Sequence, residues 1–567
     1  ERGATGDARA HPTLHPQSVL HLSGEYIYPV SPLALPAAGR LQPLAEIGRI
    51  EAVRLFVDRA QAVKPGFALT EANAPAVVEI VRRLDGLPLA LELAAARVRV
   101  LPPTALLARL DQRLPLLTGG SQDRPDRQRT LGNTIAWSCD LLGAAERSLF
   151  PRLAVFAGGW TLEAAEAVAA TDAPGDVLEA MDRLLDNSLV HALDDDAEPR
   201  YAMLETIREF GLKQLTAMGD DEPTRRRHAG YFLDLAERLT PEIDVLESLE
   251  QRAQLIAEYD NLRLALRWFG LNDEGDSLLR LTALLAGEWL ARGLLREGLE
   301  QIGPVLQRTH HIASATRVQL LHAAGVMALY QGNLGHAAPF FAESLAVAQT
   351  LGDAFLIGQS LAFSGWLSYR SSGYRRADEQ LAKARHLLQN IADPVRATLV
   401  LIVSGDNALV QERFGQARLH YEQTTALLRA GRYAWILADA QSGLAGAHYC
   451  LGNIRQAAIL YAESLRRIDP QNVTVQLVSA LIGHAAVAAA TGRPGDGAQL
   501  LGAAEGFVES SDARIFPRDY PVRRRALDAL THALGERQLS SQIAAGRSLT
   551  LDQVHAAAQG IMAGMND

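Results

Sequence analysis

Apolar residues recur at helical spacing between about residues 263 and 525, and the pattern repeats with a period of 40 residues. One column of the repeat holds bulky residues, namely Phe341, Leu381, Tyr421, Tyr461 and Leu501. A second column holds small ones, namely Gly325, Gly365, Gly405, Ala445 and Ala485. Small residues let two helices approach closely, and a bulky residue then fills the gap to the next repeat. The period therefore predicts stacked pairs of helices, an α-solenoid.

Further columns keep the same register. One holds Leu334, Tyr374, Phe414 and Ile454, and three residues further on come Ala337, Ala377, Ala417 and Ala457. The turns between paired helices carry Gly332, Gly373 and Gly452, and glycine suits helix C-termini because it accepts the left-handed conformation. Five units are clear, Leu294 suggests an earlier one, and Pro494 marks a looser last one.

The helix-turn-helix unit with these columns resembles the tetratricopeptide (TPR) repeat, with longer helices than the usual unit of about 34 residues. An array of this kind is a curved surface that can hold a protein, a peptide or a small effector. Candidates on that surface are Tyr330, Tyr369, Arg370 and Tyr449. Ordinary packing explains each of them as well, because aromatic residues at helical spacing are mostly core residues.

The chain before the array is predicted to begin with a helical domain at residues 46–127. Four apolar residues share one face of its first helix: Val53, Phe56, Val57 and Ala60. Two further helices, between residues 75 and 96, are separated at Gly86 and Pro88. Pro75 and Pro88 each suit the first turn of a helix, where the missing N–H would have no partner.

Residues 128–217 show the element order of a winged helix. A first helix at 130–142 turns Trp137 and Leu141 inward, and Thr161 can cap a short helix after Gly158-Gly159. A third helix spans 177–185, and strands at 188–193 and 200–203 flank the acidic turn at 194–196. A helix at 205–215 closes the unit.

The stretch Arg82-Arg83-Leu84-Asp85-Gly86-Leu87-Pro88-Leu89 resembles the Gly-x-Pro helix of the STAND signalling ATPases (signal-transduction ATPases with numerous domains). Residues 22–33 resemble the exit from the last strand of the nucleotide domain in that family, and residues 128–217 resemble its winged helix. The resemblance implies that Gly86 and Pro88 contact the adenine of a bound nucleotide. On pattern alone, Gly-Leu-Pro-Leu is equally explained as a tight turn between helices.

Three features of the family are absent or altered in this sequence. No Gly-x-x-x-x-Gly-Lys-Ser/Thr loop occurs, so nothing in the chain would cradle phosphates. His15-Pro16-Gln17 stands where the family has a sensor arginine, and Met203-Leu204-Glu205 stands where it has a Met-His-Asp triplet. Leucine cannot donate a hydrogen bond to a phosphate. We therefore expect no cofactor in this chain, with ATP or ADP bound only through a missing upstream nucleotide domain.

The third helix of the winged helix is acidic, which bears on nucleic-acid binding. Its only basic residue is Arg183, against four acidic ones: Asp176, Glu179, Asp182 and Asp186. Such a surface is repelled by phosphates, whereas recognition helices carry Arg and Lys. We expect no direct binding to nucleic acid.

Composition narrows the class of protein further. The 567 residues are 48% hydrophobic and carry a net charge of −10, which argues against a general binder of polyanions. The two cysteines, Cys139 and Cys450, belong to no metal-ligand pattern, and no apolar run is long enough to span a membrane. We expect a cytoplasmic protein with no metal site and no catalytic residues.

These features predict a mainly α protein: a helical domain and a winged helix, followed by a TPR-like α-solenoid. The expected divisions are 1–45, a remnant of a nucleotide domain; 46–127; 128–217; 218–262, a helical linker; 263–525, the array; and 526–567, a helical tail. The STAND resemblance implies the regulatory, effector-sensing part of a bacterial transcription regulator, not itself an enzyme and able to self-associate. A free-standing TPR-like scaffold for proteins, independent of nucleotide, is the alternative.

Overall fold

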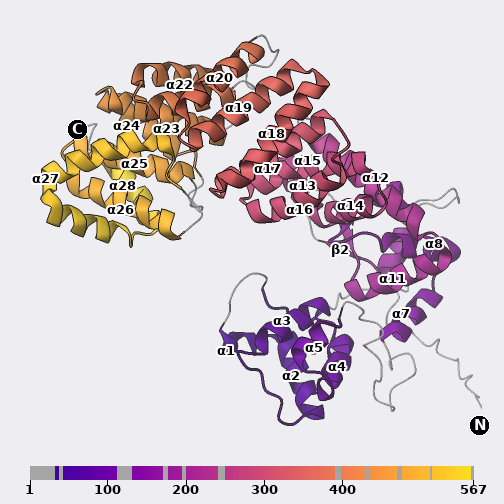
Figure 1. The fold of residues 1–567 in the computed structure, drawn as a ribbon. Helices are drawn as coiled ribbons and strands as arrows, with labels where there is room; N and C mark the ends of the chain where they lie inside the picture. Colours follow the sequence, from indigo (N-terminus) through magenta and orange to yellow (C-terminus); the bar gives the residue numbers. More distant parts are fainter. Residues whose placement is uncertain are drawn as a thin grey trace, which may run out of the picture. The chain divides into compact units, whose positions relative to one another are not determined.

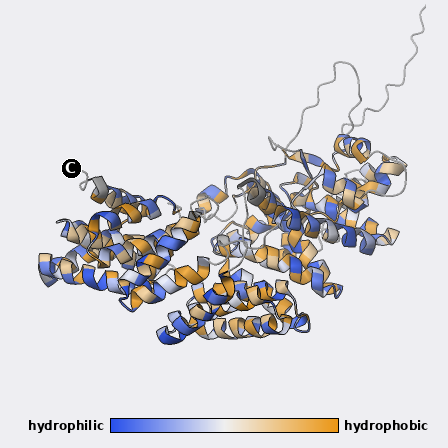
Figure 2. Cartoon of the chain, turned by 90° about the horizontal axis from the view of Figure 1, so that it is seen from above, coloured by the Kyte–Doolittle hydropathy of each residue, from blue (hydrophilic) through white to orange (hydrophobic). Residues whose placement is uncertain are grey.

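The computed structural model describes residues 32–37, 43–110, 131–169, 177–193, 199–240, 249–389, 398–428, 434–468, 475–510 and 514–563 (Figure 1). The protein is mainly helical, as predicted. It divides into two compact units, one of residues 1–239 and 248–273 and the other of residues 240–247 and 274–567. Polar and apolar residues share the same helices throughout (Figure 2), which is the pattern of helices that bury one face.

The first unit begins with the helical domain. Its elements are α1 (Leu44–Ile47), α2 (Glu51–Val63), α3 (Ala74–Arg83), α4 (Pro88–Ala96), η1 (Arg97–Arg99) and α5 (Pro103–Leu107). Helix α2 packs on α4, and Val53, Phe56 and Ala60 of α2 are fully buried. Pro75 and Pro88 lie in the first turns of α3 and α4, as their missing N–H groups predict.

The winged helix follows in the same unit. Its helices are α7 (Leu131–Asp140), α8 (Ala144–Leu153), α9 (Leu162–Ala169), α10 (Val177–Asp186) and α11 (Glu205–Met218). Its strands β1 (Trp160–Thr161), β2 (His191–Leu193) and β3 (Arg200–Ala202) form an antiparallel sheet in the order β1-β3-β2. The Thr161 hydroxyl accepts from Ala164 N at 3.2 Å, so the predicted cap of α9 is confirmed.

Two details of the winged helix differ from the sequence prediction. Leu141 is exposed, because α7 ends at Asp140 and the chain turns there. The first wing strand starts at His191 and not at Ser188, because Ser188 has the left-handed φ of 55° that belongs to a turn. The acidic turn at 194–196 lies outside the described residues.

Three more helices belong to the first unit: α12 (Asp221–Leu239), α13 (Leu249–Ala257) and α14 (Tyr259–Leu271). Helix α12 packs on α9 of the winged helix and on α14. The sequence interpretation divided these helices between a linker at 218–262 and the start of the array. In the structure they extend the winged helix instead.

The second unit holds the array. Its helices are α15 (Gly275–Ala291), α16 (Leu295–Arg308), α17 (Ala315–Tyr330), α18 (Leu334–Leu351), α19 (Ala354–Arg370), α20 (Tyr374–Leu388), α21 (Thr398–Val410), α22 (Phe414–Leu428), α23 (Ala434–Cys450), α24 (Ile454–Leu465), α25 (Val475–Ala490) and α26 (Pro494–Ser510). Successive pairs follow one another along the unit (Figure 1). From α18 to α26 the second helix of each pair begins 40 residues after the previous one, which confirms the predicted register.

The two sequence columns meet as expected. A Cβ atom on Gly405 would lie 2.8 Å from the ring of Tyr421 in the same pair, and one on Gly443 of the next pair would lie 2.3 Å from it. Tyr421 therefore fills a slot that two glycines keep open. The alanine column is fully buried at Ala337, Ala377, Ala417 and Ala457.

The turn between paired helices has a left-handed residue at the same place in five successive pairs. These residues are Gly332, Ser372, Glu412, Gly452 and Gly492, with φ between 60 and 85°. The prediction for Gly373 was wrong by one residue: its φ is −85°, and it lies at the N-cap of α20. Ser372 and Glu412 thus hold a conformation that favours glycine.

Replacing Ser372 by glycine is expected to stabilise the array by about 0.5–1 kcal/mol. The left-handed conformation costs a serine about 1–2 kcal/mol, and glycine removes that cost. Glycine also increases the conformational entropy of the unfolded chain, which offsets part of the gain. Ser372 is exposed, so no packing is lost. Gly452→Ser is the matched control and should destabilise, since a Cβ there meets nothing within 4 Å and only the backbone changes. Urea unfolding of both variants tests the pair. If both substitutions stabilised the protein, or both destabilised it, the left-handed conformation would not explain the stability of these turns.

The tail completes the second unit with η4 (Pro517–Asp519), α27 (Tyr520–Gly546) and α28 (Leu551–Ala563). Helix α27 packs on α25 and α26 and breaks at Gly535, which has φ 70° and ψ 158°. The tail therefore covers the last pairs of the array. Its helix starts at Tyr520, earlier than the expected boundary at 526.

Candidate functional site

Four first helices of successive pairs contact one stretch of chain that lies outside the repeats. We call this stretch, residues 514–519, the return segment, because it follows α26 and leads back along the array to α27. Its partners lie one on each of α19, α21, α23 and α25, namely Tyr369, Asp406, Asp439 and Ser479. The segment therefore crosses the face that the first helices form.

Arg518 is the centre of this contact, and its side chain is 1% exposed. Its Nη1 and Nη2 donate to the two carboxylate oxygens of Asp439 at 2.9 and 2.6 Å, and Nη1 also donates to Asp406 at 3.2 Å. The backbone N–H of Arg518 donates to the Tyr369 hydroxyl at 2.8 Å. One buried cation thus binds Asp439 in the forked geometry that arginine prefers and also pairs with the buried Asp406.

Hydroxyl groups donate further hydrogen bonds to two carboxylates of this cluster, those of Asp406 and Asp519. Tyr421 donates to Asp406 and Ser479 donates to Asp519, each at 2.5 Å. Burial raises the pKa of Asp406 to about 6, and the nearby Arg518 opposes that rise. Burial also raises the pKa of the Tyr369 and Tyr421 hydroxyls. A buried carboxylate is costly unless it is paired, so this face requires a cation where Arg518 lies.

Phe516 occupies a second slot beside Arg518. Its buried ring lies 4.4 Å from the Arg370 guanidinium and 5.6 Å from that of Arg518. Among the described residues, the buried Nη1 of Arg370 has no hydrogen-bond partner. The aromatic face takes the place of a carboxylate for Arg370 through a cation–π contact.

The structure brings together three of the four array candidates. Tyr369 and Arg370 contact the return segment directly. Tyr330 lies near the same charges: burial raises the pKa of its hydroxyl, and the positive charges of Arg370 and Arg518 oppose that rise. Tyr449 lies elsewhere, beside Cys450, whose carbonyl accepts from Arg525 of α27.

Sequence reasoning missed the charged centre of the site: Asp406, Asp439, Arg518 and Asp519. One signal was present, since Asp406 interrupts the apolar run Leu399-Val-Leu-Ile-Val-Ser-Gly-Asp406 in a helix. Its partners lie 112 and 15 residues away along the chain, and no spacing rule connects them.

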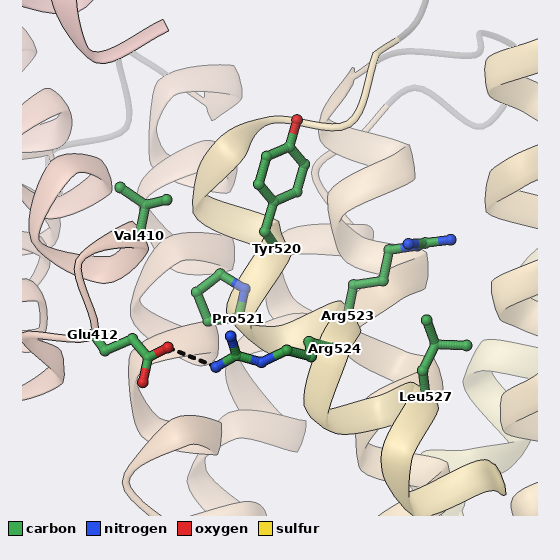
Figure 3. A pocket seen from close by; sticks show the side chains of 7 residues that line it. All are labelled: Val410, Glu412, Tyr520, Pro521, Arg523, Arg524 and Leu527. Carbon is green, nitrogen blue, oxygen red and sulfur yellow. Dashed lines mark hydrogen bonds and ion pairs between the residues drawn. The ribbon is translucent and has the colours of Figure 1, made fainter. Parts of the chain in front are cut away.

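An open cavity of about 400 Å³ adjoins the start of α27 (Figure 3). It is lined by Val410, Glu412, Tyr520, Pro521, Arg523, Arg524 and Leu527. Arg524 bonds to Glu412 at 2.5 Å, and Arg523 bonds to Glu505. Both cations therefore already have carboxylate partners, which makes the cavity a poor site for an anion.

A second buried polar network lies in the first unit and fixes the glycine turn of the winged helix. Asn261 of α14 donates to Gly159 O at 2.9 Å and accepts from Ala157 N at 2.8 Å. It also donates to Glu258, which forms a buried ion pair with Arg200 of β3. Helix α14 is thereby tied to both the turn and the wing.

Acid is expected to weaken this network through His228. Burial lowers the pKa of His228 to about 4, and its Nε2 lies 3.3 Å from Asn261 Oδ1. Because the unfolded chain takes up this proton near pH 6.5 and the folded one does not, full stability is present above pH 6.5 and falls as the pH drops towards 4. The loss is on the order of 3 kcal/mol.

Urea unfolding of wild type and His228→Leu, monitored by hydrogen exchange in α9 and α12, measures how the free energy of unfolding changes with pH. The variant should lose the pH dependence that His228 contributes between 6.5 and 4. Parallel curves for the two proteins would show that His228 is not the group responsible.

The structure places Gly86 and Pro88 at the turn between α3 and α4. Gly86 has φ 65°, its carbonyl accepts from Leu33 N at 3.1 Å, and a Cβ on it would lie 2.4 Å from Leu33 O. Glycine is needed here for both its conformation and the close approach of residues 32–37. The adenine contact of Gly86 and Pro88 stays a prediction.

Asp85, next to this turn, reaches the end of the wing. Its Oδ2 accepts from the backbone N–H of Glu205 at 3.0 Å, at the start of α11. The stretch 82–89, which carries the STAND resemblance, is therefore in contact with Met203-Leu204-Glu205, which stands where the family has its Met-His-Asp triplet. The altered sensor position His15-Pro16-Gln17 and residues 22–31 lie outside the described residues.

The third helix of the winged helix, α10, presents an acidic surface. Glu179 and Asp182 are exposed, and Arg183 is engaged by Glu146 at 3.0 Å and Glu179 at 2.7 Å. Asp176 lies outside the described residues. The arginine that would meet a phosphate is thus already paired.

The winged helix is also found by comparison with known protein families. A family described as "Winged helix-turn-helix domain" matches residues 142–216. The Mycobacterium tuberculosis protein "Putative HTH-type transcriptional regulator Rv0890c" is 35% identical over 456 residues, which are 78% of this chain and 51% of that protein. A second M. tuberculosis protein, "Uncharacterized protein Rv0894", is 37% identical over 214 residues, 37% of this chain and 51% of its own.

The chain thus spans about half the length of these relatives. It contains a winged helix-turn-helix domain and is similar to proteins named as putative HTH-type transcriptional regulators. In the part of the chain that the structure describes, no helix is long and apolar enough to cross a membrane.

Two solved structures share a similar run of helices. One is a STAND protein with a tetratricopeptide repeat sensor from Pyrococcus horikoshii, with a TM-score of 0.42, 13% identity, and coverage of 87% of this chain and 74% of that one. The other is a tetratricopeptide repeat protein from Parabacteroides merdae, with a TM-score of 0.33, 13% identity, and coverage of 52% and 99%. Neither score is high enough to carry an argument about function.

Proposed function

We propose that the chain is the regulatory and effector-sensing part of a cytoplasmic bacterial STAND-type ATPase regulator that controls transcription. The observation that carries this proposal is the hydrogen bond from Glu205 N to Asp85. It joins the turn before Gly86-Leu87-Pro88 to the end of the wing, the two places that report nucleotide state in the family the sequence resembles. The similarity to longer proteins named as HTH-type regulators supports it.

In this proposal the winged helix is a clamp and not a DNA reader. Its third helix is acidic and its one arginine is paired, so it would not approach phosphates. The array binds an effector, the clamp loosens, and the protein self-associates to act on an output domain. The chain has no catalytic activity of its own in this scheme, and nucleotide binds only when an upstream nucleotide domain is present.

Asp85→Gly tests the clamp in the whole gene product. Asp85 has φ 55°, so glycine keeps the backbone conformation and removes the carboxylate that accepts from Glu205 N. Asp85→Asn is the matched control, because asparagine also accepts a hydrogen bond and tolerates this φ. The host's transcripts are compared for wild type, both variants and a gene deletion.

The glycine variant should change the same transcripts as removal or activation of the regulator, whereas the asparagine variant should match wild type. A deletion strain with an unaltered transcriptome would remove the transcriptional proposal altogether. If wild type, Asp85→Gly and Asp85→Asn gave the same transcripts, the proposed clamp would be contradicted.

A free-standing TPR-like scaffold, independent of nucleotide, is the second candidate. Leu204 favours it, because an aliphatic side chain at the end of the wing cannot donate to a phosphate. A scaffold would bind its protein partners equally well with and without ATP or ADP. A switch would not, so pull-down of partners by the whole gene product at each nucleotide state separates the two.

A further inference from the structure

The return segment is held in the way that peptide-recognition surfaces hold a ligand. One backbone N–H, of Arg518, is bound by the Tyr369 hydroxyl. One charged side chain, of Arg518, enters a pocket with two carboxylates, and one aromatic side chain, of Phe516, lies under Arg370. Main-chain bonds of this kind supply affinity, and side-chain pockets supply specificity.

The receptor groups and the ligand groups come from different parts of the fold. Tyr369, Arg370, Asp406, Asp439 and Ser479 all belong to first helices of the repeats, from α19 to α25. The return segment belongs to none of the pairs. Without it, Asp406 and Asp439 on the first-helix face would have no cation between them. The chemistry of this face is therefore that of an arginine receptor.

Stability alone is a weak reason for such a centre. A buried ion pair often contributes no more than well-packed apolar residues of the same volume, since desolvation offsets the attraction. What the charges add is selectivity, because an uncharged side chain in place of Arg518 leaves Asp406 and Asp439 unpaired.

We propose that this face of the array is a binding site for an extended peptide segment with an arginine two residues after an aromatic residue, and that residues 514–519 occupy it until a partner protein presenting that pattern displaces them. The proposal rests on the effector-sensing function proposed for the array and names the chemistry of the effector.

A labelled peptide with the sequence Arg-Ile-Phe-Pro-Arg-Asp-Tyr tests the site on the purified chain by fluorescence anisotropy. In wild type the tethered segment competes at high effective concentration, so binding is weak. Phe516→Ala weakens the competitor and leaves both carboxylates paired, so the peptide should bind at least tenfold more tightly. A peptide with Gln at the second arginine is the matched control and should lose that gain.

Asp439→Asn added to Phe516→Ala should abolish the binding, because it removes the bidentate partner of the arginine. A folded Phe516→Ala variant that does not bind the peptide, or binds the Gln peptide equally well, overturns the proposal. If Phe516→Ala does not fold, hydrogen exchange on wild type with excess peptide decides the question. Residues 514–520 should then exchange faster while α19 to α25 stay protected, and unchanged exchange would overturn the proposal.

Failure of this inference is distinguishable from failure of the proposed function. The peptide experiments use neither nucleotide nor transcription. A bound peptide together with an unaltered transcriptome would leave the receptor in place on a scaffold protein. If the transcripts changed but the peptide did not bind, the regulatory function would stand and the effector would have a different chemistry.

Discussion

Replacing Arg518 by methionine is expected to destabilise the array by about 3–5 kcal/mol, the usual cost of removing one partner from a buried ion pair. Methionine keeps most of the aliphatic volume, so the loss comes from leaving Asp406 and Asp439 buried without a cation. Urea unfolding followed by hydrogen exchange in α21 and α23 measures the effect where the two carboxylates lie.

Two further variants separate charge from packing. Arg524→Met removes an exposed pair, in which the Arg524 and Glu412 side chains are 60% and 47% exposed, and should cost far less stability than Arg518→Met, because solvent screens the pair. Asp406→Asn with Asp439→Asn, added to Arg518→Met, should recover at least half of the loss, because no unpaired charge stays buried. A loss for Arg518→Met as small as that for Arg524→Met would contradict the central role of this cluster.

Replacing Gly546 by alanine is expected to cost about 3 kcal/mol, at the upper end of the range for overpacking. A Cβ on Gly546 would lie 2.0 Å from the backbone carbonyl oxygen of Gln499, and one on Gly502 would lie 2.1 Å from Ile543 O. Helices α26 and α27 therefore cross backbone to backbone. A carbonyl cannot rotate away as a side chain can, so the two helices must separate.

Gly495→Ala is the matched control for this crossing. It lies in α26, one of the two crossing helices, and a Cβ there meets nothing within 4 Å. Its effect should be neutral or slightly stabilising, because alanine has the higher helix propensity. Hydrogen exchange should show that Gly546→Ala loosens α26 and α27 and leaves α2 to α4 of the first unit unchanged. Loosening throughout both units would refute a local crossing.

The sequence predicted the secondary elements well where one face of a helix is buried repeatedly. The columns headed by Leu334 and Gly325 place the helices of the array, since a buried stripe must recur with the helical period. Errors occurred at turns. The left-handed residue after α19 is Ser372 and not Gly373, because the fold sets this position and a serine there tolerates the strain.

The candidate site could be predicted only in part. Tyr369 and Arg370 follow from the helical register, which places them on a first helix. That they meet Phe516 and Arg518 does not follow, because residues nearly 150 positions apart are brought together only when the segment after α26 crosses four pairs. The same holds for Asn261, which lies about 100 residues from the turn that it secures.

By itself, the sequence determined the mainly helical class, the 40-residue period of the array and the winged helix, because these depend on local spacing and on which face of each helix is apolar. Only the tertiary structure decided which charges share a buried site. Attraction between Arg518, Asp406 and Asp439 depends on distance in space, and that distance is set by how the pairs stack and where the tail returns. The sequence pattern determines which face of each helix is buried, and the stacking of the helix pairs determines which charged residues meet.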